Sequence, residues 1–325
     1  MTDKTTATAS ESGLDTIPPN EQVDVVLDTD TYNEIDDQYA LVYAILSNKI
    51  NIEAIHAAPF SDALAEDVRD ASNPGEWMEL SYEEIHRLLD RLNKSKSEFV
   101  FKGSDSYLQR PDEPIESEAV DNLIRIAKQD RPNRLFVVAI GAPTNVASAL
   151  LKQPKIAEDI VVVWLGGDAI PWPQTNQFNL AQDIFSSQQL FDCGVPLVHI
   201  PTRPVSEKLK TTVPELERHV KNRGDIGNFL FSRFAEYEAK YKNDCPNSTY
   251  SKEIWDLSAI AYLINHNWVE TTLIHSPRIT TDADRAPDPS RHFIREAKDL
   301  GRDKIFNDFF EKLEKNTEFS DYDYN

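Results

Sequence analysis

The sequence predicts an α/β fold with an open, mostly parallel sheet that is flanked by helices. Short, continuously apolar runs alternate along the chain with stretches whose apolar residues recur at helical spacing. This alternation is typical of parallel strands joined by crossover helices, because a parallel sheet is buried on both faces. About five such strands are expected, and the clearest runs are residues 23–27, 52–57, 135–140, 160–165 and 195–200.

Helical patterns fill the intervals between these runs. The capping-box pattern Ser81-Tyr82-Glu83-Glu84 precedes apolar residues at helical spacing, and we therefore predict that a helix begins there. A long amphipathic region covers about residues 214–242, and Asp256 opens a short apolar helix. Other helices are expected over about residues 38–46, 118–128 and 184–191.

The pattern continues without an internal repeat or an interdomain linker, so we expect a single domain over residues 21–325. Residues 1–20 are polar and lack an apolar stretch, which predicts a flexible tail and not a signal peptide. Residues 268–274 are predicted to form a late strand. We expect residues 280–291 to be a surface excursion and the remaining residues to form a helical cap.

Composition excludes several classes of protein. The chain has 34 Lys and Arg against 55 Asp and Glu, a formal net charge of -21 at pH 7, so nucleic acid is not an expected partner. No apolar run approaches the roughly 18 residues that a membrane span needs, so no membrane partner is expected. The distant Cys193 and Cys245 indicate free buried thiols in a reducing compartment. We therefore expect a cytoplasmic enzyme.

Five carboxylates lie within ten residues at the first predicted strand-to-helix turn, and they belong to Asp28, Asp30, Glu34, Asp36 and Asp37. Like charges this close repel one another and are costly unless a cation joins them. The carboxyl end of a strand is also where open α/β sheets bind ligands. A helix N-terminus favours acids, but that explains only the last two residues. The turn therefore predicts a hard-metal site at an active centre.

Three later stretches follow, or open just after, predicted buried strands. In Gly141-Ala142-Pro143-Thr144-Asn145, backbone carbonyls could face a cation, or Thr144 could simply cap the next helix. The segment Asn176-Gln177-Phe178-Asn179 and Asp183 offer groups suited to sugar hydroxyls, although a polar loop would look the same. Trp255-Asp256 opens an apolar helix, where Asp256 is either a ligand or an ordinary cap.

Together and in this order, the four stretches resemble the motifs of the nucleoside hydrolases, the calcium-dependent N-ribohydrolases. Asp28-Thr29-Asp30 with Asp36-Asp37 is similar to that family's Asp-x-Asp-Pro-Gly-x-Asp-Asp motif. The turn over residues 141–145 resembles its Gly-Pro-Leu-Thr-Asn, and residues 177–183 resemble its Glu-Phe-Asn…Asp. Asp256 aligns with a late aspartate of the family. The resemblance runs from about residue 23 to residue 265 and implies a Rossmann-like α/β fold.

The resemblance also implies roles for these residues. The implied Ca²⁺ ligands are Asp30, Asp37, the carbonyl of Thr144, and Asp256. This oxygen set suits calcium, which takes six to eight oxygen ligands. Asp30 would also be the general base for water that attacks an oxocarbenium-like sugar carbon, while Asp36 and Asn179 would contact the ribose. The implied partner is a small-molecule nucleoside, and the implied assembly is a homodimer or homotetramer.

The chain departs from the family pattern at three places. The turn after Asp30 is two residues longer, which brings Asn33 and Glu34 into the pocket region. Gln177 stands where the family usually has Glu. Trp255 replaces a His that is the leaving-group acid in some members, whereas the purine-preferring branch also has Trp there. Because an indole can stack on a purine, the resemblance favours purine nucleosides.

These departures make Asn33, Gln177 and Trp255 candidate substrate-binding residues beside Asp36 and Asn179. Aromatic residues elsewhere could form the opposite wall of a base pocket, although each is individually more typical of core or loop packing. They are Phe60, Trp77, Tyr82 and Trp172.

Two alternatives stay open at the level of sequence. In a phosphatase of the haloacid-dehalogenase type, Asp28 would be the nucleophile and Asp30 the acid, but Tyr32 is bulky and the Asp36-Asp37 pair has no role there. A non-catalytic nucleoside- or sugar-binding protein could keep the calcium site. The lengthened turn, Gln177 and Trp255 are compatible with that alternative.

Overall fold

The fold is built on an eight-stranded sheet, in a computed structural model that describes residues 16–61, 74–94, 99–169, 177–241 and 250–322. The strands lie in the order β3-β2-β1-β4-β5-β6-β12-β9, and all neighbours are parallel except the edge pair β12 and β9. They are β1 (Val23–Thr29), β2 (Ile50–Ala57), β3 (Val100–Lys102), β4 (Leu135–Ala139), β5 (Ile160–Leu165), β6 (Leu197–Ile200), β9 (Val269–His275) and β12 (Phe293–Leu300).

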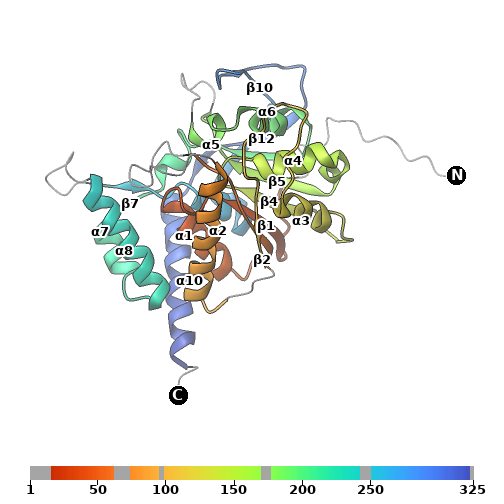
Figure 1. Cartoon of the computed structure of the whole chain (residues 1–325). Coiled ribbons are helices and arrows are strands. Elements are labelled where there is room, and N and C mark those ends of the chain that lie inside the picture. Colours follow the sequence, from red (N-terminus) through yellow and green to blue (C-terminus); the bar gives the residue numbers. More distant parts are fainter. Residues whose placement is uncertain (1–15, 62–73, 95–98, 170–176, 242–249, 323–325) are drawn as a thin grey trace.

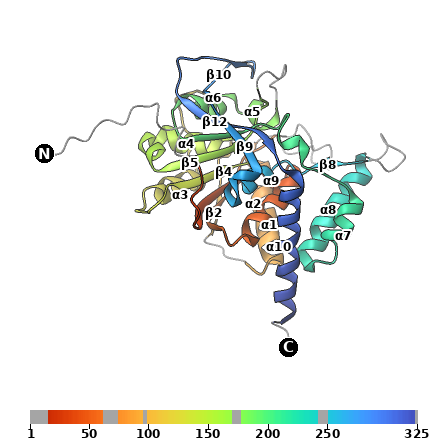
Figure 2. The same ribbon diagram turned by 180° about the vertical axis from the view of Figure 1, so that it is seen from behind.

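Helices cover both faces of this sheet, as Figures 1 and 2 show. One face carries α1 (Asp36–Leu46), α2 (Pro74–Arg91), α8 (Gly224–Tyr241), α9 (Leu257–Ile264) and α10 (Arg302–Tyr322). The other face carries α3 (Glu118–Ala127), α4 (Thr144–Lys152) and α6 (Ile184–Asp192). Side chains alternate along each strand, so Val25 and Leu27 of β1 pack in the first layer and Val26 packs in the second.

The remaining elements are short and connect the main ones. Two small antiparallel ladders pair β7 (Lys210–Thr211) with β8 (Lys252–Glu253), and β10 (Arg278–Ile279) with β11 (Arg285–Ala286). The other helical segments are α5 (Phe178–Ala181), α7 (Val213–His219) and the 3-10 helices Pro154–Glu158, Ser206–Lys208 and His266–Trp268. Within the described ranges, no helix combines the length and apolarity of a membrane span.

The strand order reverses direction between β1 and β4, which makes their carboxyl ends the topological switch point of the sheet. Open α/β sheets bind ligands in the crevice outside that point. The acidic turn after β1 and the turn over residues 141–145 after β4 are therefore brought together by the topology, as the sequence predicts.

The region beyond residue 280 was wrongly expected to be only a surface excursion and a helical cap. Strand β12 lies inside the sheet, parallel to β6 and antiparallel to β9. The side chain of Arg285, within the expected excursion, is buried, and its guanidinium donates to the buried carboxylate of Glu296 in β12. This strand escaped prediction because four of its eight residues carry charged side chains, so the apolar alternation is weak.

Three further boundaries differ from expectation. Helix α2 begins seven residues before Ser81, whose hydroxyl accepts the backbone N–H of Tyr32 and does not cap a helix. The amphipathic region is two helices, α7 and α8, because Asn222 and Gly224 adopt positive φ between them. The expected flexible tail over residues 1–20 is wrong for its last part, since Thr16 is buried and its carbonyl accepts the Tyr262 hydroxyl. Residues 1–15 lie outside the described ranges.

The cysteine expectation is met in part. Cys193 is free, as expected, but it is exposed and not buried. Cys245 lies outside the described residues.

Candidate active site

The acidic turn is held by β1 and by the first turn of α1. Asp30 directly follows β1, whereas Asp36 and Asp37 begin α1, and all three side chains are at most 5 % exposed. The Thr29 hydroxyl donates to the carboxylate of Asp37. Asn33 closes the intervening turn, because its backbone N–H donates to the Asp30 carbonyl at 2.8 Å and its amide Nδ2 donates to the Asp30 carboxylate at 3.1 Å.

Asp28 is a structural residue within β1. It is fully buried, and its Oδ2 accepts from Nδ2 of Asn145 at 2.8 Å. The Oδ1 of Asn145 accepts from the backbone N–H and the hydroxyl of Ser104, so this amide ties together the ends of three chain segments. Asp28 does not line the cavity and is not exposed, so its carboxylate is not placed to attack a substrate phosphate there, and the phosphatase alternative does not fit the structure.

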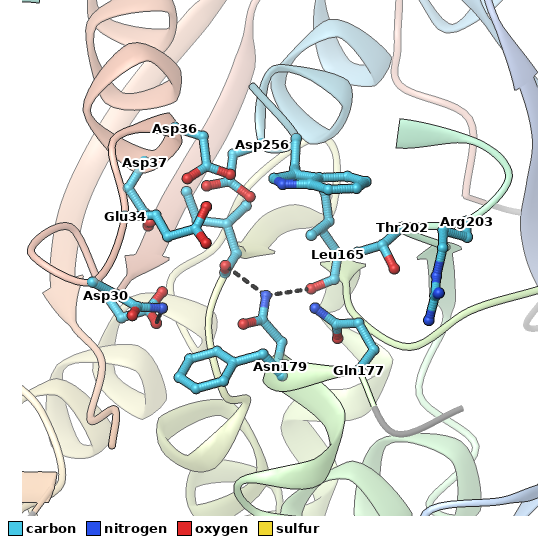
Figure 3. Close-up of a pocket in the computed structure, with 14 residues that line it drawn as sticks. Asp30, Glu34, Asp36, Asp37, Leu165, Gln177, Asn179, Thr202, Arg203 and Asp256 are labelled. Atoms are coloured by element: carbon cyan, nitrogen blue, oxygen red, sulfur yellow. Dashed lines mark hydrogen bonds between the residues drawn. The ribbon is translucent and has the colours of Figure 1, made fainter. Parts of the chain in front are cut away.

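Asn179 presents one polar atom to the site. Its Nδ2 donates to the backbone carbonyls of Ile140 at 2.9 Å and Leu165 at 3.0 Å, at the ends of β4 and β5 (Figure 3). Both amide hydrogens are therefore used to fix the side chain. The carbonyl oxygen is left as the acceptor that Asn179 offers to a ligand, and a sugar hydroxyl is a donor of the right kind.

The amide of Gln177 is held through its oxygen, whereas that of Asn179 is held through its nitrogen. Its Oε1 accepts the backbone N–H of Gly167 at 2.7 Å and that of Leu180 at 3.3 Å, so it caps the short helix α5. What this side chain can still offer a ligand is its NH₂ group. The replacement of a family Glu by Gln177 therefore removes a negative charge and adds a donor.

Asp256 and Trp255 stand at the head of α9. Asp256 is buried, and its side chain makes no capping hydrogen bond, so the alternative of an ordinary N-cap is wrong. Next to it, the buried Lys252 lies 5.7 Å from the centre of the Trp255 ring and donates to Glu34 at 2.6 Å. The lengthened turn thus contributes a carboxylate, Glu34, whose charge is balanced by a lysine of β8.

These side chains meet in one cavity of about 320 Å³, within the usual size range of small-molecule sites. Figure 3 shows the carboxylates gathered at one end and Arg203 at the other. The cavity is lined by Asp30, Asn33, Glu34, Asp36, Asp37, Ile140, Leu165, Gln177, Phe178, Asn179, Thr202, Arg203, Trp255 and Asp256. All of the nine predicted site residues except Thr144 line this cavity.

Burial dominates the electrostatics of the acidic end. It raises the pKa of Asp36 to about 7, with the charge of Glu34 adding to the rise and Lys252 opposing it. Burial likewise raises the pKa values of Asp30, Asp37 and Asp256, and in each case the neighbouring carboxylates raise it further. Ionising all of them together is costly unless a cation shares the site.

The donor set fits a hard metal ion. Carboxylate oxygens of Asp36, Asp37 and Asp256 lie within 4.8 Å of one another, and all three residues are buried. This trio contains Asp36, which the resemblance assigned to the ribose, and not Asp30. Oxygen-only ligands of this charge suit calcium or magnesium better than a transition metal. A bound cation would also relieve the repulsion that raises these pKa values.

Comparison with known proteins shows which family this chain belongs to. The profile of the family described as Inosine-uridine preferring nucleoside hydrolase matches residues 25–287. The chain belongs to the nucleoside hydrolase family. It is therefore a glycosidase of the class that acts on N-glycosyl compounds, and ribonucleosides are the substrates of this family. Members generally bind a metal, which agrees with the buried acidic cluster.

Solved nucleoside hydrolases share the fold. The purine-preferring ribonucleoside hydrolase of Gardnerella vaginalis is 20 % identical, with a TM-score of 0.71 over 91 % of this chain and 99 % of that one. The plant nucleoside hydrolase PpNRh1 is 16 % identical, with a TM-score of 0.71 over 90 % and 98 %. The inosine-uridine preferring enzyme of Bacillus anthracis is 15 % identical, with a TM-score of 0.68 over 90 % and 100 %.

The match to a curated relative covers a smaller part of the chain. An uncharacterized protein of Schizosaccharomyces pombe is 27 % identical over 110 residues. That match covers 32 % of this chain and 34 % of the relative, so the chain spans about a third of the length of that protein.

Some predicted residues of this nucleoside hydrolase lie away from the cavity. Thr144 is buried and its hydroxyl donates to Asp183 at 2.7 Å, so its side chain caps no helix. Asp183 caps α6 by accepting the backbone N–H of Ser186. Phe60 and Trp77 are buried against each other, with ring centres 5.1 Å apart. Tyr82 packs on the ring of His86. Trp172 lies outside the described residues.

Two cavity residues that follow β6 were not predicted from the sequence. Thr202 and Arg203 lie at the same sheet edge as the acidic turn because the carboxyl ends of parallel strands share one edge. The signal that could have found them is their position directly after the predicted strand over residues 195–200. Nothing in the local pattern of Thr202-Arg203-Pro204 distinguishes it from an ordinary loop.

Proposed function

We propose that this nucleoside hydrolase cleaves the N-glycosidic bond of purine ribonucleosides with calcium at the acidic end of the cavity. The observation that carries the proposal is the convergence of Asp30, Asp36, Asp37 and Asp256 with the carbonyl of Asn179 on one cavity of nucleoside size. Family membership supplies the reaction class. The choice of calcium rests on the all-oxygen donor set.

We assign Asp30, Asp37 and Asp256 to the ion as ligands, because all three line the cavity, whereas Thr144, the fourth ligand that the resemblance implies, does not line it. The proximity of Asp36 to Asp37 and Asp256 makes Asp36 a further candidate. When bound, calcium supplies a positive charge that lowers the pKa of the attacking water and offsets the repulsion among the carboxylates.

The chain's own residues carry the remaining steps. Asp30 accepts a proton from the water as the water oxygen attacks the anomeric carbon, and Asn33 keeps the carboxylate oriented through its hydrogen bond. Asn179 accepts a hydrogen bond from a ribose hydroxyl, and Asp36 accepts another. Because the carbonyl of Asn179 is fixed by two backbone contacts, the sugar is oriented without much loss of side-chain freedom.

The purine preference is argued from Trp255. Its indole lines the cavity beside Asp256, and Lys252 lies near its ring. A large aromatic surface stacks better on a bicyclic purine than on a pyrimidine. An indole donates no proton as an imidazolium does, so Trp255 would bind the base and would not protonate it.

A reducing-sugar assay on a panel of ribonucleosides tests the proposal directly. We expect ribose release with calcium, loss of release with excess chelator, and higher kcat/KM for purine nucleosides than for pyrimidine nucleosides. Asp30→Asn should lower kcat by about 10²- to 10⁴-fold, the range of general-base catalysis, without unfolding the protein. The control Asp130→Asn makes the same chemical change at an exposed position and should leave kcat unchanged.

The outcomes separate the hypotheses. Calcium-dependent binding of nucleosides without ribose release would support the binding-protein alternative. Release that persists in chelator would contradict the metal assignment, and turnover retained in Asp30→Asn would contradict the general base. Assembly as a homodimer or homotetramer and a cytoplasmic location stay predictions, which sedimentation and cell fractionation would test.

A further inference from the structure

Arg203 is a fixed cation at the end of the cavity opposite the carboxylates. Its Nε donates to Oδ1 of Asp168 at 3.2 Å and its Nη2 donates to Oδ2 at 2.6 Å. Asp168 is fully buried, so this contact orients the guanidinium from behind. The Asp168 hydrogen bonds raise the pKa of Arg203, which therefore stays charged.

The loop that carries Asp168 is itself held in place. The Thr202 hydroxyl donates to Asp168 at 2.6 Å, and the backbone N–H of Arg203 donates to the same carboxylate at 3.0 Å. The guanidinium of Arg285 donates to the backbone carbonyl of Asp168. A preorganised donor of this kind costs little reorganisation when charge develops near it.

Figure 3 places Asp30 and Arg203 at opposite ends of the cavity. In hydrolysis with inversion, the attacking water and the departing group lie on opposite sides of the anomeric carbon. If Asp30 holds the water, the base leaves toward the half of the cavity that contains Arg203. The nearby Gln177 also has only donors to offer there, because its Oε1 is used by Gly167 and Leu180.

The departing base needs such a donor. As the bond from the anomeric carbon to the base nitrogen breaks, its electron pair leaves with the base, which becomes an anion unless it is protonated. Trp255 stands where some family members have an acidic His, and an indole cannot supply that proton. Nor can Arg203, since a guanidinium does not lose its proton in proteins. Its hydrogen bonds can still stabilise the anion.

We propose that Arg203, oriented by Asp168, binds the leaving base and stabilises the negative charge that develops on it. The inference rests on the proposed function and extends it to the leaving group. Water adds its oxygen to the anomeric carbon and gives one proton to Asp30. The base departs with the electron pair of the broken bond, held by the N–H groups of Arg203, and takes its proton from bulk water afterwards.

The charge balance selects the kind of substrate. Asp168 neutralises Arg203 overall, so the pair offers directed donors without a net positive charge. Such a site favours a charge that appears during the reaction over a permanently anionic ligand. Bases with carbonyl acceptors, such as the O6 and N7 edge of a 6-oxopurine, match the guanidinium best.

The test compares substrates whose leaving groups differ in how much stabilisation the departing anion requires. Nitrophenolate is a stable anion, so a p-nitrophenyl riboside requires little stabilisation, whereas a nucleoside requires much. Arg203→Gln should lower kcat on inosine by about 10²- to 10³-fold, as the loss of one oxyanion donor does. The same variant should retain kcat on the nitrophenyl riboside within about threefold, which corresponds to about 0.65 kcal/mol.

Two further variants sharpen the result. Arg203→Lys keeps the charge without the planar pair of donors, and we expect an intermediate loss on inosine. Arg233→Gln removes an exposed arginine that pairs with Glu236, and it should change neither substrate. Thermal unfolding of each variant shows whether the fold is intact.

The outcomes distinguish failure of the leaving-group role from failure of the proposed function. Equal losses on both substrates would overturn the proposal and would indicate a structural role for Arg203. A loss that disappears with a 5′-deoxynucleoside would also overturn it, because Arg203 would then bind the hydroxymethyl group of the sugar. If the unsubstituted enzyme hydrolyses neither substrate, the proposed function itself fails. Hydrolysis of both by the unsubstituted enzyme, with an unchanged ratio in Arg203→Gln, overturns only the leaving-group role.

Discussion

Gly141 lies against the carboxylate of Asp30. A Cβ added to Gly141 would be 2.5 Å from Oδ1 of Asp30 and 2.8 Å from its Cγ. Contacts this short do not occur, so only a residue without a side chain allows β4 to end beside the proposed general base. The glycine that opens the turn over residues 141–145 is thus explained by the closeness of its backbone to the Asp30 side chain and not by an unusual φ angle.

We therefore expect Gly141→Ala to displace Asp30. The other carboxylate oxygen, Oδ2, accepts a hydrogen bond from Asn33, so a displacement of the carboxylate would strain or break that bond. A shift of about 1 Å in a catalytic group can cost 10²-fold in rate, and we expect a loss of that order in kcat. Gly301→Ala is the matched control, because its Cβ would meet only the flexible side chain of Lys304 at 3.3 Å. Unchanged kcat in Gly141→Ala would show that Asp30 has room to move.

Lys252 is predicted to stabilise the lengthened turn. Its ammonium donates to Glu34 at 2.6 Å, and the side chains are only 9 % and 17 % exposed. Breaking a fully buried pair costs about 3–5 kcal/mol, and the partial exposure of Glu34 lowers our expectation for Lys252→Met to about 2–3 kcal/mol. Chemical denaturation measures this change in the free energy of unfolding.

A neighbouring lysine gives the control for this prediction. Lys210 pairs with Glu253 on the same small ladder but is about half exposed, so Lys210→Met should change stability by less than about 1 kcal/mol. Adding Glu34→Gln to Lys252→Met should recover part of the loss, because no unpaired carboxylate then remains. A double variant that is as unstable as the sum of the single variants would show that the pair is not coupled.

The local sequence pattern and the order of the motifs predicted the acidic end of the site. Its residues lie in short motifs next to clearly apolar segments. Asp30, Asp36 and Asp37 belong to one strand-to-helix turn, and Asp256 opens an apolar helix, so their proximity follows from the parallel topology. The Arg203 end could not be predicted in the same way. Its orientation depends on Asp168, 35 residues earlier in the chain, and no local periodicity reports such a contact.

Strand β12 also depends on contacts that lie far apart in the sequence. The strand predicted over residues 268–274 is present as β9, but β12 was not predicted because it carries Arg295, Glu296, Lys298 and Asp299 among its eight residues. Glu296 is nonetheless buried, since His199 and Arg285 surround its carboxylate. A charged residue in a buried strand is compatible with the fold only when distant partners compensate it. The local sequence around Glu296 does not indicate that His199, 97 residues earlier, will be its partner.

The stability of the metal-free protein should depend on pH. Burial raises the pKa of Asp28 and of Asp36 to about 7 in the folded protein, against about 3.9 in an unfolded chain. The folded state therefore favours the protonated carboxyls. Their contribution to stability is complete below about pH 4 and is lost as pH rises through 7, so chelated protein should become less stable between pH 5 and pH 8.

Calcium should act in the opposite direction. A cation binds the ionised carboxylates and competes with protons, so its affinity rises as pH rises. At 100 times its Kd a ligand adds about 2.7 kcal/mol to the free energy of unfolding. We expect the difference in stability between calcium-loaded and chelated protein to grow from pH 5 to pH 8, and to shrink in Asp256→Asn. A difference that is constant over this range would mean that calcium binds away from the buried carboxylates, because only groups that change protonation can couple the two equilibria.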